Sequence, residues 1–208
     1  MLFVHGTDET WGYFNPMTEA FERAGWARER LYAVRLFPNN GQVPIEVMAY
    51  QVRRAAASLL RHTGAERLDV VAYSQGALSA RYWIQALGGQ SRVRRFISIS
   101  GPHHGTRAAY LLGDPAFVQM RPDSDFLREL DRYDDWGDTQ VFTFWTPWDG
   151  TIIPARSAWL PGATEHVFHV FPHQLMLDAP CIITAAQQVL APPVLAVPPR
   201  LLAPQGSP

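Results

Sequence analysis

The stretch LDVVAYSQGALSARY, residues 68–82, constrains the fold more than any other part of the chain. An apolar run of strand type passes through Ser74 and Gly76 directly into a segment of helical composition. Serine is a poor core residue, and glycine weakens both helices and strands. We therefore expect a sharp turn that holds the Ser74 hydroxyl at the rim of a sheet. The alternative is a serine that caps an ordinary helix.

Short apolar runs alternate with helical patterns, which predicts a mostly parallel α/β sheet of about six strands with helices on both faces. The expected strands are residues 2–4, 32–36, 68–73, 94–100, 141–145 and 167–170. The expected helices are residues 16–24, 45–62, 77–87 and 180–190, the second with Val47, Tyr50, Ala55 and Leu59 on one stripe. Sheets of this kind carry their sites at the carboxyl ends of the strands.

The length and composition suit one domain. The 208 residues, 47% of them apolar, can form a single sizeable core, which we expect over residues 1–190. Residues 107–138 are charged and turn-rich, and we expect either a surface excursion or a cap over the strand ends, with a partial lid as a further alternative. Six of the 18 residues in 191–208 are proline, which predicts an extended tail.

The formal net charge of -1 predicts no strong steering field, so nucleic acid is not an expected partner. No apolar run reaches the roughly 18 residues that span a bilayer. The start, MLFVHG, lacks the features of a signal peptide. We therefore expect a soluble chain with neither a signal peptide nor a transmembrane segment. Cys181, the one cysteine, cannot form an internal disulfide, and its apolar neighbours predict a buried thiol.

The arrangement at residues 68–82 matches a known motif, in which a strand leads through a small-x-Ser-x-Gly turn into a helix and the turn exposes the serine as a nucleophile. A serine hydroxyl needs a base, and in chains with this turn the order is serine, acid, histidine. His173 follows the last predicted strand and is favoured over His169, whose alternative is a histidine in or on the sheet. Asp149 closes the preceding strand and is favoured over Asp138, which precedes that strand. The alternative for Asp149 is a simple Asp-Gly turn.

An oxyanion needs two main-chain donors. One is the N–H after the nucleophile, that of Gln75. The other is expected from the loop after the first strand, where Gly6 allows close approach and the Thr7 N–H can point inward.

Two further features bear on a substrate pocket. The adjacent His103 and His104 in SGPHHGT lack the spacing of a metal site, so we expect no metal and a loop that either lines the cleft or braces the region of His173. The residues proposed for the pocket are Trp11, Tyr73, His104 and Trp148. Five aromatic residues near strand ends could form an acyl slot or an interfacial patch, with core packing as the alternative: Trp11, Tyr13, Phe14, Trp145 and Trp148.

With these motifs placed, the chain resembles bacterial lipases of the α/β-hydrolase superfamily, and among them the class 2 triacylglycerol lipases that include the compact lipases of Bacillus. The resemblance covers about residues 2–190 and is carried by VHG, LDVVAYSQGALSARYW, SGPHHGT, DSDFLREL, DGTIIP and LPGATEHVFHVFPH. It implies a compact α/β-hydrolase fold. It also implies that Ser74 is the nucleophile, Asp149 the acid and His173 the base, with the N–H groups of Thr7 and Gln75 as the oxyanion hole.

The sequence departs from that family at the elbow. Ala72 replaces the usual first glycine, and Tyr73 and Gln75 stand where His and Met are frequent in the Bacillus branch, so a pocket of different shape is expected. The resemblance implies hydrolysis of carboxylic esters of the acylglycerol type. No cofactor is expected, because water and the three side chains suffice, and the aromatic residues named above are consistent with transient contact with a lipid interface. Many relatives are secreted. The alternatives are an acyltransferase or thioesterase with the same triad, an amidase or peptidase, and a non-catalytic binding module on this scaffold.

Overall fold

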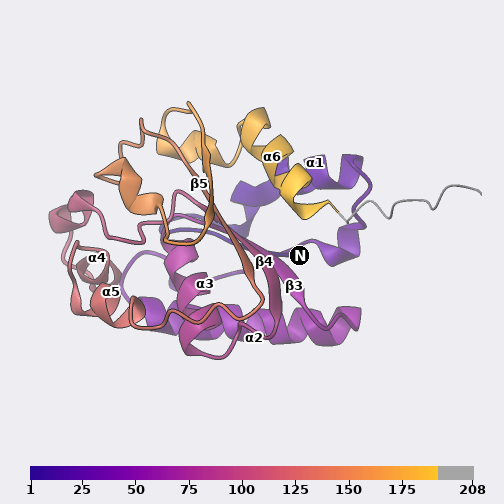
Figure 1. Cartoon of the computed structure of the whole chain (residues 1–208), viewed down its shortest axis with the longest axis horizontal. Helices are drawn as coiled ribbons and strands as arrows, with labels where there is room; N and C mark the ends of the chain where they lie inside the picture. Colours follow the sequence, from indigo (N-terminus) through magenta and orange to yellow (C-terminus); the bar gives the residue numbers. More distant parts are fainter. Residues whose placement is uncertain (192–208) are drawn as a thin grey trace, which may run out of the picture.

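A computed structural model describes residues 1–191, and the predicted tail from residue 192 onward lies outside the described residues. The chain folds around a sheet of six parallel strands in the order β2-β1-β3-β4-β5-β6 (Figure 1). The strands are β1 (Leu2–Val4), β2 (Tyr32–Ala33), β3 (Leu68–Tyr73), β4 (Val93–Ile99), β5 (Gln140–Trp145) and β6 (Thr164–Val167). The predicted fold class is confirmed.

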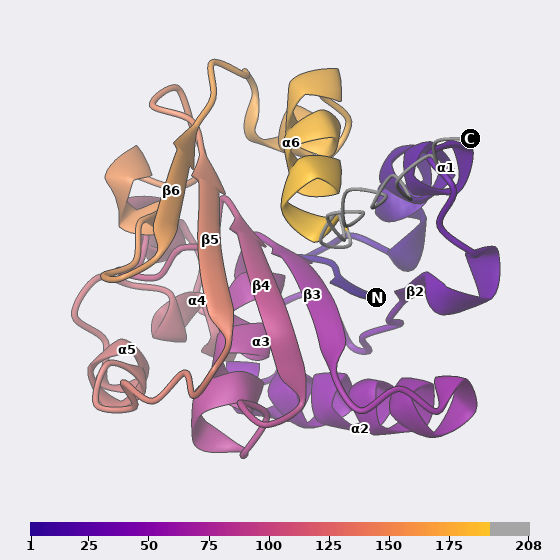
Figure 2. The same cartoon turned by 45° about the vertical axis from the view of Figure 1, so that its right-hand side comes forward.

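Helices cover both faces of the sheet. They are α1 (Asn15–Arg23), α2 (Ile45–Thr63), α3 (Gln75–Ala86), α4 (Pro115–Gln119), α5 (Asp125–Leu130) and α6 (Pro180–Leu190). Figures 1 and 2 show α1 and α6 on one side of the sheet and α2 and α3 on the other. No helix within residues 1–191 has both the length and the apolar character needed to cross a membrane.

Alternation along β3 divides the core into two halves. Val70 and Ala72 pack with the residues of α2 and α3, while Val71 and Tyr73 pack with those of α1 and α6. Successive side chains of a strand point to opposite faces, and a central parallel strand is buried on both. This explains why residues 68–73 read as a continuous apolar run, and why the predicted strand matches β3 residue for residue.

The stripe predicted on α2 is only partly correct, because Leu59 is buried and Ala55 packs against the same core, whereas Val47 and Tyr50 do not. Val47 and Tyr50 are 41% and 51% exposed. The buried face consists of Ile45, Met48, Ala49, Val52, Ala56 and Leu59, which recur at helical spacing. The predicted end of the helix is confirmed, because Gly64 follows it with φ 67°.

Three other local predictions need correction. β6 lies at 164–167 rather than 167–170, because Phe142–Trp145 pair with that earlier segment. β2 has two residues rather than five. The Cys181 thiol is exposed rather than buried, because it lies one position before Ile182 and Ile183, which take the buried face of α6.

The segment 107–138 packs against the first turns of α2 and α3. It contains a 3-10 turn, η3 (Arg107–Leu111), followed by α4 and α5. Its apolar residues, Ala109, Ala116, Met120, Phe126, Leu127 and Leu130, form a cluster with Ile45 of α2 and Leu78 of α3. The segment thus covers the ends of these helices, beside the carboxyl ends of the strands.

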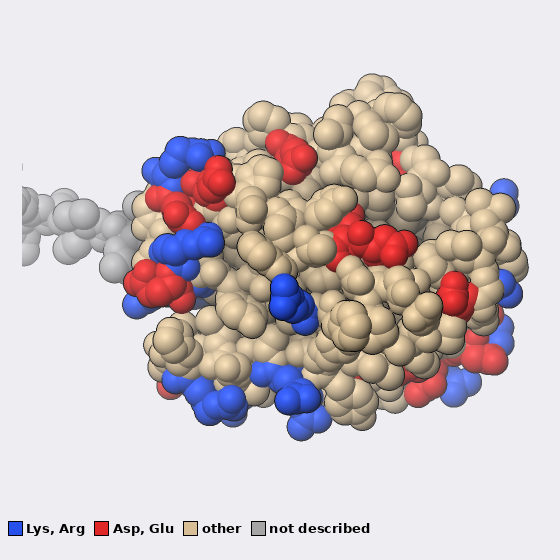
Figure 3. Space-filling view, turned by 180° about the vertical axis from the view of Figure 1, so that it is seen from behind, with Lys and Arg blue, Asp and Glu red and all other residues tan. Residues whose placement is uncertain are grey.

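Charged side chains are interspersed on the surface. Figure 3 shows one face on which Arg and acidic side chains lie mostly toward the margins, with broad uncharged areas between them. This distribution accords with the near-zero net charge of the chain.

Candidate active site

The turn after β3 holds Ser74 in a strained conformation. Its φ of 53° and ψ of -132° cost a non-glycine residue on the order of 1–3 kcal/mol. The main chain of α3 then passes directly beneath the end of β1. A Cβ built on Gly76 would lie 2.2 Å from the carbonyl oxygen of His5, so this position accepts only glycine. The close approach holds the Ser74 hydroxyl above the rim of the sheet, at the start of α3.

Three distant side chains meet at this point. His173 Nε2 lies 3.1 Å from Ser74 Oγ, and His173 Nδ1 lies 2.7 Å from Asp149 Oδ2. His173 and Asp149 are buried and Ser74 is partly buried. The residues predicted to act together therefore form one continuous hydrogen-bonded chain, from separate loops after β3, β5 and β6.

Asp149 is held as a carboxylate by the turn after β5. Its Oδ1 accepts the N–H groups of Thr151 and Ile152 at 2.9 and 2.8 Å, while Oδ2 faces His173. Burial by itself would raise the pKa of Asp149, but the hydrogen bond and the charge of His173, with the two N–H groups, hold it below its ordinary value. A carboxylate placed in this way fixes the His173 tautomer that carries its proton on Nδ1.

His173 is positioned by the residue that precedes the nucleophile. The Tyr73 hydroxyl donates to the His173 carbonyl oxygen at 3.0 Å, and the two ring centroids lie 4.9 Å apart. The rival histidine, His169, is exposed and lies against Trp148 with ring centroids 5.0 Å apart. The rival acid, Asp138, is exposed and precedes β5. Neither rival contacts Ser74.

The loop after β1 presses a second main-chain segment against Ser74. A Cβ on Gly6 would lie 2.9 Å from the Ser74 Cβ. Burial lowers the pKa of His5, whose Nε2 accepts the Leu36 N–H at 3.2 Å and whose Nδ1–H donates to the Gly6 carbonyl oxygen at 2.9 Å. In a trans peptide the C=O and N–H point in opposite directions, so this bond turns the Thr7 N–H away from His5.

Both predicted oxyanion donors lie beside the nucleophile. Thr7 lines the same cavity as Ser74. Gln75 is the first residue of α3, so its N–H has no acceptor within the helix. The Gln75 side chain turns away from the cavity, since its Nε2 donates to Ser79 Oγ at 3.0 Å.

A cavity of about 340 Å³ opens beside Ser74 and His173. One wall is polar and consists of Thr7, Asp8 and Glu9. The opposite wall is largely apolar and consists of Ala108, Ala109, Leu111, Leu112, Phe117, Met120 and Ile152. Most of the apolar wall belongs to the segment 107–138.

The structure does not bring the predicted pocket residues to this cavity. Trp11 and Trp148 are exposed and lie outside its lining. His104 is also exposed and stacks on Trp159, with ring centroids 6.2 Å apart. Tyr73 is fully buried below the site, where it supports His173 instead. The cavity wall is largely aliphatic and comes mostly from the segment 107–138, whereas the prediction rests on side chains near the strand ends.

The other predicted aromatic residues also lie elsewhere. Phe14 and Trp145 are buried in the body of the protein, and Tyr13 is exposed. Within residues 1–191, no group of three or more His, Cys, Asp or Glu side chains has the arrangement of a metal site.

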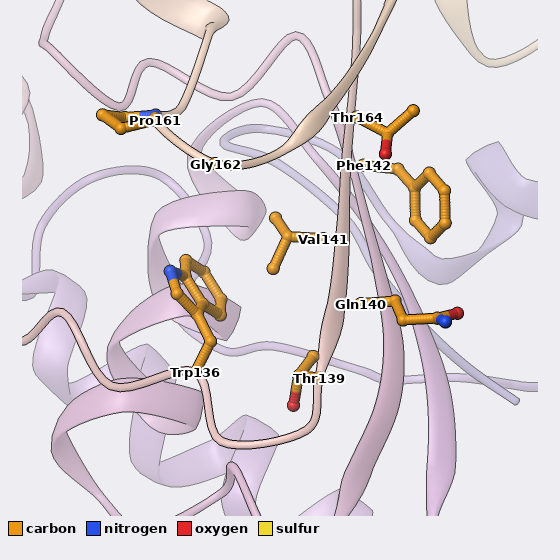
Figure 4. Close-up of a pocket in the computed structure, with 8 residues that line it drawn as sticks. All are labelled: Trp136, Thr139, Gln140, Val141, Phe142, Pro161, Gly162 and Thr164. Atoms are coloured by element: carbon orange, nitrogen blue, oxygen red, sulfur yellow. The ribbon is translucent and has the colours of Figure 1, made fainter.

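A second cavity of about 380 Å³ lies at the amino ends of β5 and β6, away from Ser74 (Figure 4). Figure 4 shows the Trp136 and Val141 side chains on one side of β5, with Gln140 and Phe142 directed to the other. None of the eight residues that line this cavity is ionisable. It therefore offers no acid or base that could activate the hydroxyl of Thr139 or Thr164.

Two parts of the site escaped the sequence interpretation. The first is the apolar wall, whose signal is the apolar runs at 108–112 and 116–118 within an otherwise polar segment. The second is Glu9, a buried carboxyl in the cavity wall. An acidic residue three positions after a His-Gly pair has no pattern that distinguishes it from a surface residue.

Comparisons with known proteins agree with this fold. The sequence pattern of the palmitoyl protein thioesterase family matches residues 1–143. A triacylglycerol lipase of Pseudomonas fragi is 36% identical over 64 residues. That match covers 31% of this chain, which spans only 21% of the length of that lipase.

Solved structures of low sequence identity share the whole architecture. The mature Bacillus licheniformis lipase BlEst2 matches with a TM-score of 0.76 at 17% identity, over 91% of this chain and 90% of that one. The product of the gene lin2722 of Listeria innocua matches with a TM-score of 0.69 at 14% identity, over 91% and 92%. Aspergillus fumigatus lipase B matches with a TM-score of 0.69 at 19% identity, over 89% and 50%.

These matches confirm the resemblance to α/β-hydrolases of the lipase and esterase kind that the motifs indicated. The family match covers the first four strands, the start of β5, the nucleophile elbow and the capping segment. The chain therefore belongs to the palmitoyl protein thioesterase family and has the α/β-hydrolase fold.

Proposed function

We propose that the protein is a serine hydrolase that cleaves carboxylic esters through Ser74, His173 and Asp149. The hydrogen-bonded chain from Ser74 Oγ through His173 to Asp149 Oδ2, with distances of 3.1 and 2.7 Å, carries the proposal. These three groups supply a nucleophile, a base within reach of its proton, and a carboxylate that orients the base.

In the first step, His173 Nε2 takes the Ser74 proton while Oγ bonds to the acyl carbon. The tetrahedral intermediate collapses, the alcohol leaves with that proton, and the acyl group stays on Ser74. Water then attacks the acyl-enzyme with His173 as base again, which releases the carboxylic acid and restores the serine. Asp149 stays ionised throughout and stabilises the imidazolium that forms in each half-reaction.

The N–H groups of Thr7 and Gln75 are proposed to hold the oxyanion. Both lie beside Ser74 and come from main-chain segments that sterics hold in place: the His5–Gly6 turn and the start of α3. Removing one such donor costs about 3–4 kcal/mol in comparable sites. A preformed hole would also explain the strain at Ser74, because a relaxed turn would move Oγ away from both donors.

The cavity favours an apolar acyl group. Its aliphatic wall and volume of about 340 Å³ suit an acyl chain lying along residues 108–120. Tyr110, Leu111 and Leu112 are exposed at or near this wall, which supports transient contact with a lipid interface. Acylglycerol-type esters are therefore the proposed substrates. The Pseudomonas fragi match is to a triacylglycerol lipase, which supports the same choice.

A thioesterase is the second candidate, and the family match to palmitoyl protein thioesterases favours it. The same three side chains would act, and the leaving group would be a thiol instead of an alcohol. The acyl pocket serves both reactions. The two candidates therefore differ only in the leaving group, an alcohol or a thiol, and in the protein surface that contacts it.

Rates on two matched substrate series test the proposal. We expect hydrolysis of p-nitrophenyl esters from two to sixteen acyl carbons, measured below and above the concentration at which each substrate aggregates. Acyl-thioesters of the same chain lengths compare the two leaving groups, and added alcohols reveal acyl transfer. A rate on thioesters that exceeds the ester rate at every chain length would favour the second candidate.

Variants test the assigned residues. Ser74→Ala should abolish hydrolysis and covalent labelling by a fluorophosphonate, while the fold remains, because a small residue suits the elbow. His173→Ala should lose far more activity than the matched control His169→Ala, whose side chain is exposed away from Ser74. Retention of most activity in Ser74→Ala would remove the nucleophile assignment. The reverse order of the two histidine variants would reassign the base.

A further inference from the structure

Glu9 is a buried carboxyl that the proposed mechanism does not use. It is 8% exposed and lines the cavity together with Ser74 and His173. Asp8, the other carboxyl in the lining outside the triad, is exposed. A buried acidic side chain is costly unless a specific partner holds it, so the contacts of Glu9 show what it does.

The partner of Glu9 is the main chain of the loop that faces the nucleophile. Its Oε2 accepts the Gly6 N–H at 2.9 Å. A Cβ built on Gly6 would lie 3.2 Å from Glu9 Oε2 and 3.4 Å from Ser74 Oγ. The carboxyl and the nucleophile thus flank the same glycine.

The rest of the loop is tied down on the same side. The Asp8 N–H donates to the Asn39 carbonyl oxygen at 2.7 Å, and the Asn39 side chain donates to the Glu9 carbonyl oxygen. His5 holds the Gly6 carbonyl oxygen, as described above. Glu9 is therefore the side chain that fixes the N–H end of Gly6, while His5 fixes its C=O end.

No cation balances the charge of Glu9. Within residues 1–191 it has no ion-pair partner, and no Arg lines the cavity. The titratable groups around it are His5 on β1's end, Asp8 in the loop, Tyr13 on the 3-10 turn η1 (Trp11–Phe14), Tyr73 on β3 and His173 across the cavity. Burial raises the pKa of Glu9 to about 7; the Gly6 N–H opposes this effect and the charge of Asp8 adds to it. The carboxyl therefore changes charge near neutral pH.

We propose that Glu9 is a positioning residue, whose carboxyl clamps the Gly6 N–H and so holds the Gly6–Thr7 main chain against Ser74. This inference rests on the proposed function, because the Thr7 N–H is one of the two proposed oxyanion donors. When ionised, Glu9 also places a negative charge beside the position where the oxyanion forms. The neutral acid keeps a carbonyl oxygen as acceptor for Gly6 without that charge.

The two effects predict different behaviour for two variants. Glu9→Ala removes the acceptor, so kcat should fall about tenfold or more at every pH with little change in KM. Glu9→Gln keeps an acceptor oxygen and is always neutral, so it should match the wild type near pH 6. Above pH 8 it should exceed the wild-type kcat by about tenfold. The reason is that the Glu9 carboxylate of the wild type repels the negative charge of the oxyanion across Gly6, in a partly buried site where such repulsion is strong.

The experiment measures kcat and KM of the full chain on p-nitrophenyl butyrate from pH 5.5 to 9.5. The matched control is Glu29→Gln, which changes an exposed glutamate far from the cavity and should leave the profile unchanged. Exchange of the Gly6 amide proton, followed by NMR, reports the clamp without any substrate. It should be faster in Glu9→Ala and unchanged in Glu9→Gln.

The outcomes separate the two proposals. Equal Gly6 exchange in the wild type and Glu9→Ala would overturn the clamp, whatever the activity. A Glu9→Gln profile parallel to that of the wild type would overturn the effect of charge. Slow Gly6 exchange in the wild type and Glu9→Gln, together with no ester hydrolysis and no fluorophosphonate label on Ser74, would support the clamp and reject the proposed function.

Discussion

Arg95 offers a direct test of how the sheet is joined to the last helix. Its guanidinium, on β4, makes two hydrogen bonds to Asp69 of β3 at 2.9 and 2.8 Å. It also donates to the carbonyl oxygens of Val189, Leu190 and Ala191 at 2.9, 3.2 and 3.0 Å. One buried side chain therefore binds two strands and the otherwise unpaired carbonyl end of α6. Arg95→Met keeps most of the side-chain volume and removes every one of these bonds.

The size of the effect follows from burial. The side chains of Arg95 and Asp69 are 9% and 8% exposed, so each partner has given up most of its hydration. Removing one partner of a buried ion pair costs about 3–5 kcal/mol. Arg94 still pairs with Asp69 at 2.6 Å in the variant, so we expect the lower end, about 3 kcal/mol.

Arg94→Met is the matched control, because it removes the neighbouring arginine from the same carboxylate. The Arg94 side chain is 54% exposed, and exposed ion pairs contribute about 1 kcal/mol or less. Urea unfolding of both variants, followed by circular dichroism, gives the two free energies of unfolding. Arg95→Met should lower the urea midpoint by about 1 M or more. If Arg95→Met lost no more free energy of unfolding than Arg94→Met, the proposal that Arg95 links the sheet to α6 would be refuted.

Three further predictions follow from single contacts. Glu9→Gln should stabilise the protein by about 2.5 kcal/mol more at pH 8 than at pH 5, because a carboxyl whose pKa is raised from 4.5 to about 7 costs the wild type stability as pH rises through that window. Equal differences at both pH values in urea unfolding would contradict the burial of this charge. Gly76→Ala should lower the free energy of unfolding by about 3 kcal/mol or more and abolish activity, because its Cβ would lie 2.2 Å from the His5 carbonyl oxygen. A variant with the thermal stability of the wild type would show that the turn at Ser74 can widen. Leu112→Trp should shift the ester preference toward short acyl chains at unchanged stability, because residue 112 is half-exposed and lines the cavity; an unchanged chain-length profile would place the acyl group elsewhere.

The parts of the site that follow from local chemistry were predictable. Residues 68–73 indicate a buried parallel strand, because the side chains, Asp69 excepted, are apolar on both faces, and Ala72 and Gly76 leave room for a tight turn at Ser74. Asp149 and His173 follow strands in the sequence, and the carboxyl ends of parallel strands meet at one edge of the sheet. The structure brings these side chains within hydrogen-bonding distance. Their catalytic roles stay a prediction that the variants test.

The sequence by itself thus determined the parallel α/β architecture, the sharp turn at Ser74 and the edge of the sheet at which reactive side chains gather, because periodicity and backbone sterics act over a few residues. Only the tertiary structure decided which face of α2 is buried, that Cys181 is exposed, that residues 108–120 form the apolar wall and that Glu9 faces Gly6 beside the nucleophile. Each of these depends on partners from elsewhere in the chain. On α2 the helical period limits the choice to a few apolar stripes, and the partner that packs against the helix selects one of them.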